Sequence, residues 1–166
     1  MCALLGISVG CRCCARYGNK EQRDAVTNKV LFTVPGEPCP WTVWTRRGPK
    51  PVGFENMEVW QEAIQVAAIR ACGGKPLWEG PIKLEMEFWR QILHSAPKKP
   101  DSLARWKERH IIMRPDCLNY AKAAEDALKG IIFNDDRQVV ALISSKQYSL
   151  HAPLTRIKVE RLLAWQ

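Results

Sequence analysis

The sequence predicts an α+β domain, in which a mixed β-sheet of four to five strands has two main helices packed on it, in the order β-α-β-α-β-β. Apolar residues recur at helical spacing in residues 55–74 and 118–129. Strand-like runs flank both segments; they are rich in β-branched and aromatic residues or alternate between apolar and polar side chains. Two helices among so few strands favour a helical layer on one face of the sheet.

The first half of the domain predicts a strand, a helix and a second strand. The run KVLFTV at residues 29–34 is β-branched and aromatic, and a Pro-Gly pair ends it. In residues 55–74 the helical pattern stops at a Gly-Gly pair, as helices commonly do. The run IKLEMEFW at residues 82–89 alternates apolar side chains with Lys and Glu, which is the period of a strand with one buried face.

A long basic connection follows at residues 90–115, and two interpretations of it remain open. From Lys98 to Arg114 it holds six Lys or Arg residues against two acids, with Trp106 in the middle. It is either a solvated loop with a short helix around residues 102–109, or a segment that grips a phosphate backbone and stacks its tryptophan on an unpaired base.

The second half predicts a helix at residues 118–129, a turn around NDD, and strands at residues 138–146 and 155–163. At about 100° per residue, one arc of this helix is apolar and mostly alanine, so the helix can lie very close to the sheet. The arc consists of Tyr120, Ala121, Ala123, Ala124, Ala127 and Leu128. The opposite face carries Lys122, Glu125, Asp126 and Lys129. Leu118 also falls on this polar face, where an apolar residue is out of place.

The charge balance indicates a polyanionic partner. The 166 residues include 25 Lys and Arg against 17 Asp and Glu, a net charge of +8. Such an excess attracts polyanions, of which nucleic acid is the commonest, although a basic surface can also serve solubility alone. No run approaches the ~18 apolar residues that a membrane-spanning helix needs.

The cysteines indicate the compartment of the protein, and the N-terminal segment indicates where its folded domain begins. Seven cysteines, an odd number at irregular spacing, argue against a disulfide framework and favour the cytoplasm. The cluster CRCC, with Cys11, Cys13 and Cys14, invites a zinc interpretation, but no second knuckle completes a tetrahedral set. Residues 1–28 are expected to form a flexible N-terminal extension, and residues 29–166 the folded domain.

The segment RPDCLNYAKAAEDALKGIIFNDDRQVV, residues 114–140, gathers five carboxylates within 21 residues of a basic chain. Singly they have ordinary explanations: Asp116 can cap the following helix, and Asp135 and Asp136 can form a turn. Together they repel one another unless cations lie between them, and oxygen-only ligands suit Mg2+ or Mn2+. Such an ion beside DNA can activate a water molecule, and Lys122 can add positive charge to the transition state. The segment therefore predicts a metal-ion site that catalyses the cleavage of a polyanion such as DNA.

The same segment resembles the RusA family of Holliday-junction resolvases. The family order Pro-Asp-x-x-Asn-x-x-Lys-x-x-x-Asp-Ala-Leu, followed by Asp-Asp-x-Gln-Val, reads here PDCLNYAKAAEDALKG…NDDRQVV. Upstream the likeness is looser but collinear, through FTVPGEPCP, VWQEAI and IKLEMEFW. The resemblance implies a RusA-like fold and a homodimeric, Mg2+-dependent endonuclease of DNA recombination and repair, bacterial or phage-encoded. It would bind branched DNA, not membranes, and resolve four-way junctions by paired nicks.

Carried over position by position, the resemblance implies catalytic roles for Asp116, Lys122 and Asp136. Together with the carboxylates nearby, the expected metal ligands are Asp116, Asp136, Asp135, Glu125 and Asp126. The expected contacts with the DNA backbone are Arg46, Arg47, Lys50, Lys98, Lys99, Arg105, Lys107, Arg109 and Arg114.

Leu118 departs from the family pattern, because that position usually carries a second essential aspartate. One interpretation is that Glu125, ~10 Å further along the helix axis, supplies the missing carboxylate and that the ion shifts toward Lys122. The other is that metal binding is impaired and that the protein only binds branched DNA. A cysteine-based metal or redox protein is a third, separate hypothesis.

Overall fold

The computed structural model describes residues 28–42, 48–49, 53–74 and 77–162. Its elements are β1 (Lys29–Pro35), α1 (Phe54–Cys72), β2 (Ile82–Gln91), α2 (Pro100–Ile111), α3 (Cys117–Leu128), a 3-10 turn (Asp136–Gln138), β3 (Val139–Ser149) and β4 (Leu154–Arg161). The predicted α+β class is confirmed, and the predicted order holds except that α2 is an additional helix. Residues 1–27 of the predicted N-terminal extension, with the CRCC cluster, and Arg46, Arg47 and Lys50 lie outside the described residues.

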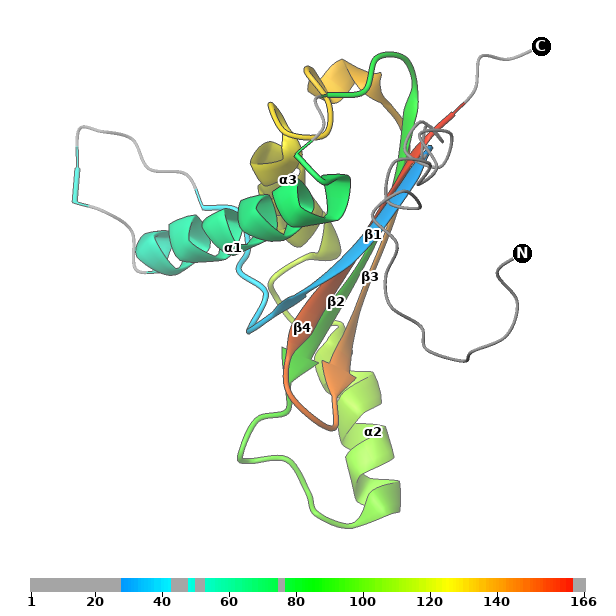
Figure 1. Ribbon diagram of the computed structural model, residues 1–166. Helices are drawn as coiled ribbons and strands as arrows, with labels where there is room; N and C mark the ends of the chain where they lie inside the picture. Colours follow the sequence, from blue (N-terminus) through cyan, green and yellow to red (C-terminus); the bar gives the residue numbers. More distant parts are fainter. Residues whose placement is uncertain (1–27, 43–47, 50–52, 75–76, 163–166) are drawn as a thin grey trace, which may run out of the picture.

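The four strands form one mixed sheet in the order β1-β4-β2-β3. Strand β4 pairs antiparallel with both β1 and β2, whereas β3 pairs parallel with β2 at one edge. Helices α1 and α3 pack on one face of this sheet (Figure 1). None of the described helices is long and apolar enough to cross a membrane.

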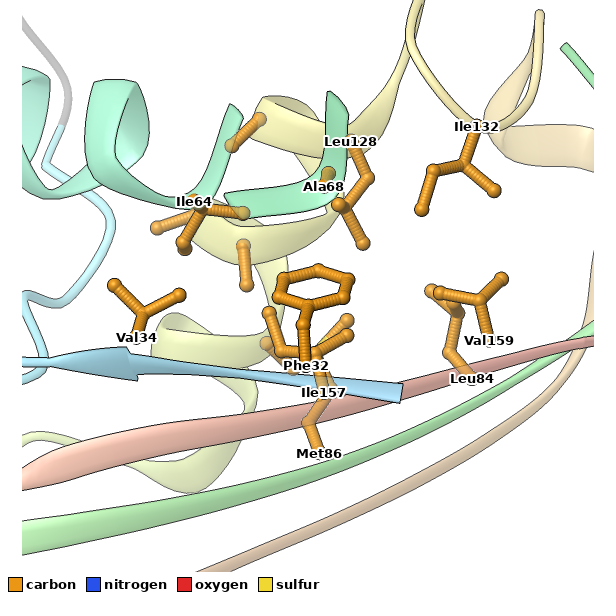
Figure 2. Packing of buried hydrophobic residues seen from close by; sticks show 14 of the residues in the cluster. Phe32, Val34, Ile64, Ala68, Leu84, Met86, Leu128, Ile132, Ile157 and Val159 are labelled. Atoms are coloured by element: carbon orange, nitrogen blue, oxygen red, sulfur yellow. The ribbon is translucent and has the colours of Figure 1, made fainter. Parts of the chain in front are cut away.

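The core lies between the sheet and the α1–α3 layer. In β2 the predicted alternation is confirmed, because Ile82, Leu84, Met86 and Phe88 are buried while the residues between them are only half-buried. Figure 2 shows side chains of β1, β2 and β4 meeting those of the two helices, with Phe32 at the centre of the view. A one-residue register shift would expose this face, so the pattern also fixes the strand pairing.

The predicted alanine arc of α3 is confirmed in full. All six of its residues are buried, and the Tyr120 ring lies 5.3 Å from the ring of Phe88 on β2. The Gln61 side chain of α1 donates a hydrogen bond to the carbonyl oxygen of Ala123, 2.9 Å away, which links the two helices. Because the buried face is small, the polar face of α3 is fixed at a short distance from the sheet.

Residues 90–115 contain helix α2, which is longer than the predicted helix at 102–109. The binding of a phosphate backbone by this segment stays a prediction. Helix α2 has a proline in its first turn and no fully buried residue. It packs against the end of β3, outside the α1–α3 layer (Figure 1).

The opposite face of the sheet is covered by ion pairs. Lys158 on β4 lies 2.7 Å from Glu85 on β2, and Arg156 lies 3.1 Å from Glu87. Lys83 approaches the same Glu85 carboxylate at 2.9 Å. These contacts hold the pKa of Glu85 down at about 2, chiefly through the hydrogen bond from Lys158.

Candidate metal and nucleic-acid site

The N-terminus of α3 is anchored to strand β3. The Lys146 ammonium donates hydrogen bonds of 2.8 Å to the carbonyl oxygens of Met113 and Pro115. At the first residue of α3, the Cys117 thiol donates to the Ser144 hydroxyl at 3.2 Å. These contacts fix the segment that leads into Asp116. Sequence analysis missed Lys146, because nothing in its local pattern signals a partner more than 30 residues away.

Asp116 stands at the N-cap position of α3, but its carboxylate makes no capping hydrogen bond. Its side chain is exposed to solvent. The capping interpretation is therefore wrong for this residue, and its carboxylate faces solvent next to the anchored segment.

The polar face of α3 holds a cluster of charges around Lys122. The Lys122 Nζ atom lies 2.9 Å from Asp126 Oδ1, 3.8 Å from Glu125 Oε2 and 3.9 Å from Asp136 Oδ2. Lys129 Nζ approaches the other Asp136 oxygen at 3.6 Å. Residues of the helix and of the 3-10 turn thus meet at one point, and the three carboxylates carry one more charge than the two ammonium groups. We refer to Lys122, Glu125, Asp126 and Asp136 as the acidic cluster.

The acidic cluster perturbs its own protonation equilibria. Burial raises the pKa of Glu125, whose side chain is only 16% exposed, and the charges of Asp136 and Asp126 raise it further against the opposing effect of Lys122. The hydrogen bond to Asp126 raises the pKa of Lys122, so its ammonium stays charged. A site with crowded carboxylates and one costly ionised acid favours the uptake of a cation.

The turn that carries Asp136 is built by its neighbours. Arg137 donates to Asp135 from its backbone N–H at 2.9 Å and from its guanidinium at 3.0 Å, which lowers the pKa of Asp135. Gln138 accepts from the N–H groups of Asn134 and Asp135, and donates to the carbonyl oxygens of Trp78 and Gly80. The turn interpretation is confirmed for Asp135. Gln138, which sequence analysis missed, fixes the turn.

The donors of the acidic cluster suit a hard divalent cation, although they are not spaced as a finished coordination shell. Three carboxylates already surround one positive charge, the Lys122 ammonium, and oxygen-only donors are those that Mg2+ and Mn2+ prefer. Within the described residues, no group of three or more Asp, Glu, His or Cys side chains is positioned to hold a metal ion. The donor atoms of the acidic cluster therefore fit a hard divalent cation, and the side chains would have to move closer together to coordinate it.

Asp116 and the acidic cluster lie at different levels of α3. At 1.5 Å per residue, Asp116 is ~15 Å from Asp126 along the helix axis. The ion pairs of the described residues include none between Asp116 and this cluster. Leu118, 68% exposed, is one turn before Lys122, where a carboxylate would have bridged part of the gap.

The expected DNA contacts gather on α2 and the segments beside it. Within the described residues, the side chains of Lys98, Lys99, Arg105, Arg109 and Arg114 are exposed, and Lys107 is half-buried. Helix α2, which carries Arg105, Lys107 and Arg109, lies at the end of β3 away from the turn that precedes this strand (Figure 1).

Comparison with known proteins agrees with this architecture. Residues 35–160, well over half of the chain, match the family described as Endodeoxyribonuclease RusA. The chain is also 34% identical over 76 residues to the uncharacterized protein YqaN of Bacillus subtilis (strain 168), a stretch covering 42% of this chain and 51% of that protein. The chain thus spans about half the length of this curated relative. Because this match covers most of the chain, including helices α1 to α3 and strands β2 and β3, the chain belongs to the RusA endodeoxyribonuclease family.

Proposed function

We propose that the protein is a Mg2+-dependent endodeoxyribonuclease that nicks four-way DNA junctions. The observation that carries the proposal is the convergence of Glu125, Asp126 and Asp136 on a single ammonium, in a chain of the RusA family. The net charge of +8 supports a polyanionic substrate.

Glu125, Asp126 and Asp136 would hold the ion. When bound, Mg2+ or Mn2+ would supply an activated water molecule and compensation for the charge that develops on the phosphate. Lys122 contributes the positive charge that the chain itself can direct at a phosphate, since its pKa is raised and it stays protonated. This arrangement favours the interpretation in which Glu125 replaces the carboxylate missing at Leu118.

The remaining residues of the proposal bind rather than cut. Exposed Lys and Arg side chains on and beside α2 would neutralise phosphates, which makes affinity depend steeply on salt. We also propose a homodimer, because two symmetric nicks across a two-fold junction require a two-fold pair of sites.

One observation favours a second candidate, a protein that binds junctions without cutting them. Leu118 is exposed at the position of the family aspartate, and the described carboxylates are not spaced as a finished metal shell. Under this alternative, Leu118→Asp would restore activity that the natural chain lacks.

A nicking assay separates the two candidates. A labelled four-way junction is incubated with the full chain in Mg2+, with EDTA as the blank. We expect nicking by the natural chain, its loss in Asp136→Asn, and its retention in Glu62→Gln, which removes an exposed carboxylate from α1. Binding without nicking, with nicking gained in Leu118→Asp, would establish the second candidate instead. Full nicking by Asp136→Asn would contradict the proposed site.

A further inference from the structure

A hollow beside α2 is lined by none of the residues of the acidic cluster. It has a volume of about 290 Å3 and is lined by Pro97, Ser102, Arg105, Trp106, Arg109 and His110. This volume is at the lower end of the ~300–1,000 Å3 typical of small-molecule sites, so the hollow suits one small planar group rather than an extended ligand.

The aromatic wall of the hollow is held in place. The Trp106 and His110 rings stack at 4.0 Å with an interplanar angle of 16°, and His110 Nδ1 lies 2.8 Å from the Trp106 carbonyl oxygen. The Tyr148 ring of β3 lies 5.1 Å from Trp106 at an interplanar angle of 53°, and its hydroxyl donates to the His110 carbonyl oxygen at 3.3 Å. A stacked pair that is fixed before binding loses little entropy when a further ring is added.

Two arginines frame this wall. Arg105 and Arg109 are exposed and lie one helical turn apart, so both guanidinium groups border the same hollow. In the described part of the chain neither forms an ion pair with an acid; Arg105 donates only to the Asp101 carbonyl oxygen, at 3.4 Å. Guanidinium groups without a carboxylate partner are suited to phosphate.

We propose that this hollow receives one unpaired nucleotide of the DNA, with the base stacked on the Trp106–His110 pair and the flanking phosphates on Arg105 and Arg109. This inference rests on the proposed function, because it assumes that the ligand is DNA. Every base presents a face that can stack, so the site would select unpaired over paired nucleotides and not one sequence.

The position of the hollow gives it a role separate from cutting. Trp106 contacts Tyr148 at the end of β3, whereas the turn with Asp136 leads into Val139 at the start of that strand. Nine residues separate Val139 from Tyr148, which is ~30 Å at ~3.3 Å per residue. One protomer would therefore hold an opened nucleotide well away from the bond that it cuts.

Fluorescence anisotropy tests the proposal with the full chain in EDTA, so that no cutting occurs. The probes are a labelled single strand of thymidines and a fully paired duplex of equal length. Trp106→Ala is expected to weaken single-strand binding about tenfold and duplex binding much less, while Trp106→Phe retains most of the preference. The paired change Arg105→Gln and Arg109→Gln is expected to weaken both and to lower the salt dependence. An unchanged ratio of single-strand to duplex affinity in a folded Trp106→Ala protein would overturn the proposal.

A second measurement needs no variant. A duplex with one unpaired 5-iododeoxyuridine is irradiated with the natural chain, and the cross-linked residue is identified by mass spectrometry. We expect cross-links to Trp106 or His110; cross-links only outside α2 would overturn the proposal. A chain that cross-links here but never nicks would refute the nuclease and leave this site standing. A chain that nicks but cross-links elsewhere would do the reverse.

Discussion

The substitution Glu125→Gln separates the stability of the fold from its affinity for a metal ion. At neutral pH the ionised Glu125 costs stability, because burial and two neighbouring carboxylates raise its pKa on folding. The sign follows from this direction: the penalty is absent below the unfolded value of 4.5 and is present once the folded group has ionised. Glutamine keeps the shape of the side chain and removes the charge.

The magnitude follows from the contacts that are lost. Glu125 lies 3.8 Å from Lys122, too far for a strong hydrogen bond, and such partly exposed pairs contribute about 0.3–1 kcal/mol. The loss of this attraction is offset by the relief of burial and repulsion, so the free energy of unfolding should change by less than about 1 kcal/mol. For a chain of this size that shifts Tm by no more than about 2–4 °C.

The effect on the metal ion should be larger than the effect on the fold. Loss of an outer-shell partner commonly costs ~10–100-fold in metal affinity, so loss of a ligand should cost at least tenfold. At a Mg2+ concentration 100 times the natural Kd, stabilisation of about 2.7 kcal/mol should fall to about 1.4 kcal/mol.

Thermal unfolding with and without Mg2+ measures both effects, with Glu62→Gln as the control for losing a carboxylate. Two results would refute the reasoning. One is full stabilisation of Glu125→Gln by Mg2+. The other is a loss of more than about 2 kcal/mol in its absence, which would give Glu125 a structural role.

Two further predictions concern the sheet and the helix layer. The pKa of Glu85 is held at about 2 in the folded chain. Its contribution to stability is therefore present above the unfolded pKa of 4.5 and is lost as the pH falls toward 2. The Tm difference between the natural chain and Glu85→Gln should disappear over that range. Ala124 is fully buried on α3, so Ala124→Leu should cost about 1–3 kcal/mol in urea unfolding, whereas Ala104→Leu on the exposed side of α2 should cost almost nothing. Equal costs for the two alanine variants would mean that α3 does not lie close to the sheet.

The elements that the sequence predicted are those in which buried residues recur at the regular spacing of a strand or a helix. The alternation in β2 and the alanine arc of α3 each identify one buried face, and the structure confirms both. Helix α2 was predicted only as a short helix at residues 102–109 within one of two interpretations, because it buries no residue fully and so has no clear buried face in its sequence.

The site was predictable in its residue types but not in its grouping. The motif spacing placed Lys122 and Glu125 on one helical face, which the structure confirms. Which carboxylates meet depends on how α3 packs against the turn, and no spacing encodes that. Asp136 joins the acidic cluster, Asp135 binds Arg137, and Asp116 stays at the other end of the helix.

Mn2+ relaxation in NMR spectra of the labelled full chain would locate the ion that the nuclease proposal requires. If the acidic cluster holds it, substoichiometric Mn2+ should broaden the amide signals of Lys122–Asp126 and of Asp136 most strongly, and Asp136→Asn should abolish this effect. Broadening centred on Asp116, with the signals around Asp136 unaffected, would contradict the account.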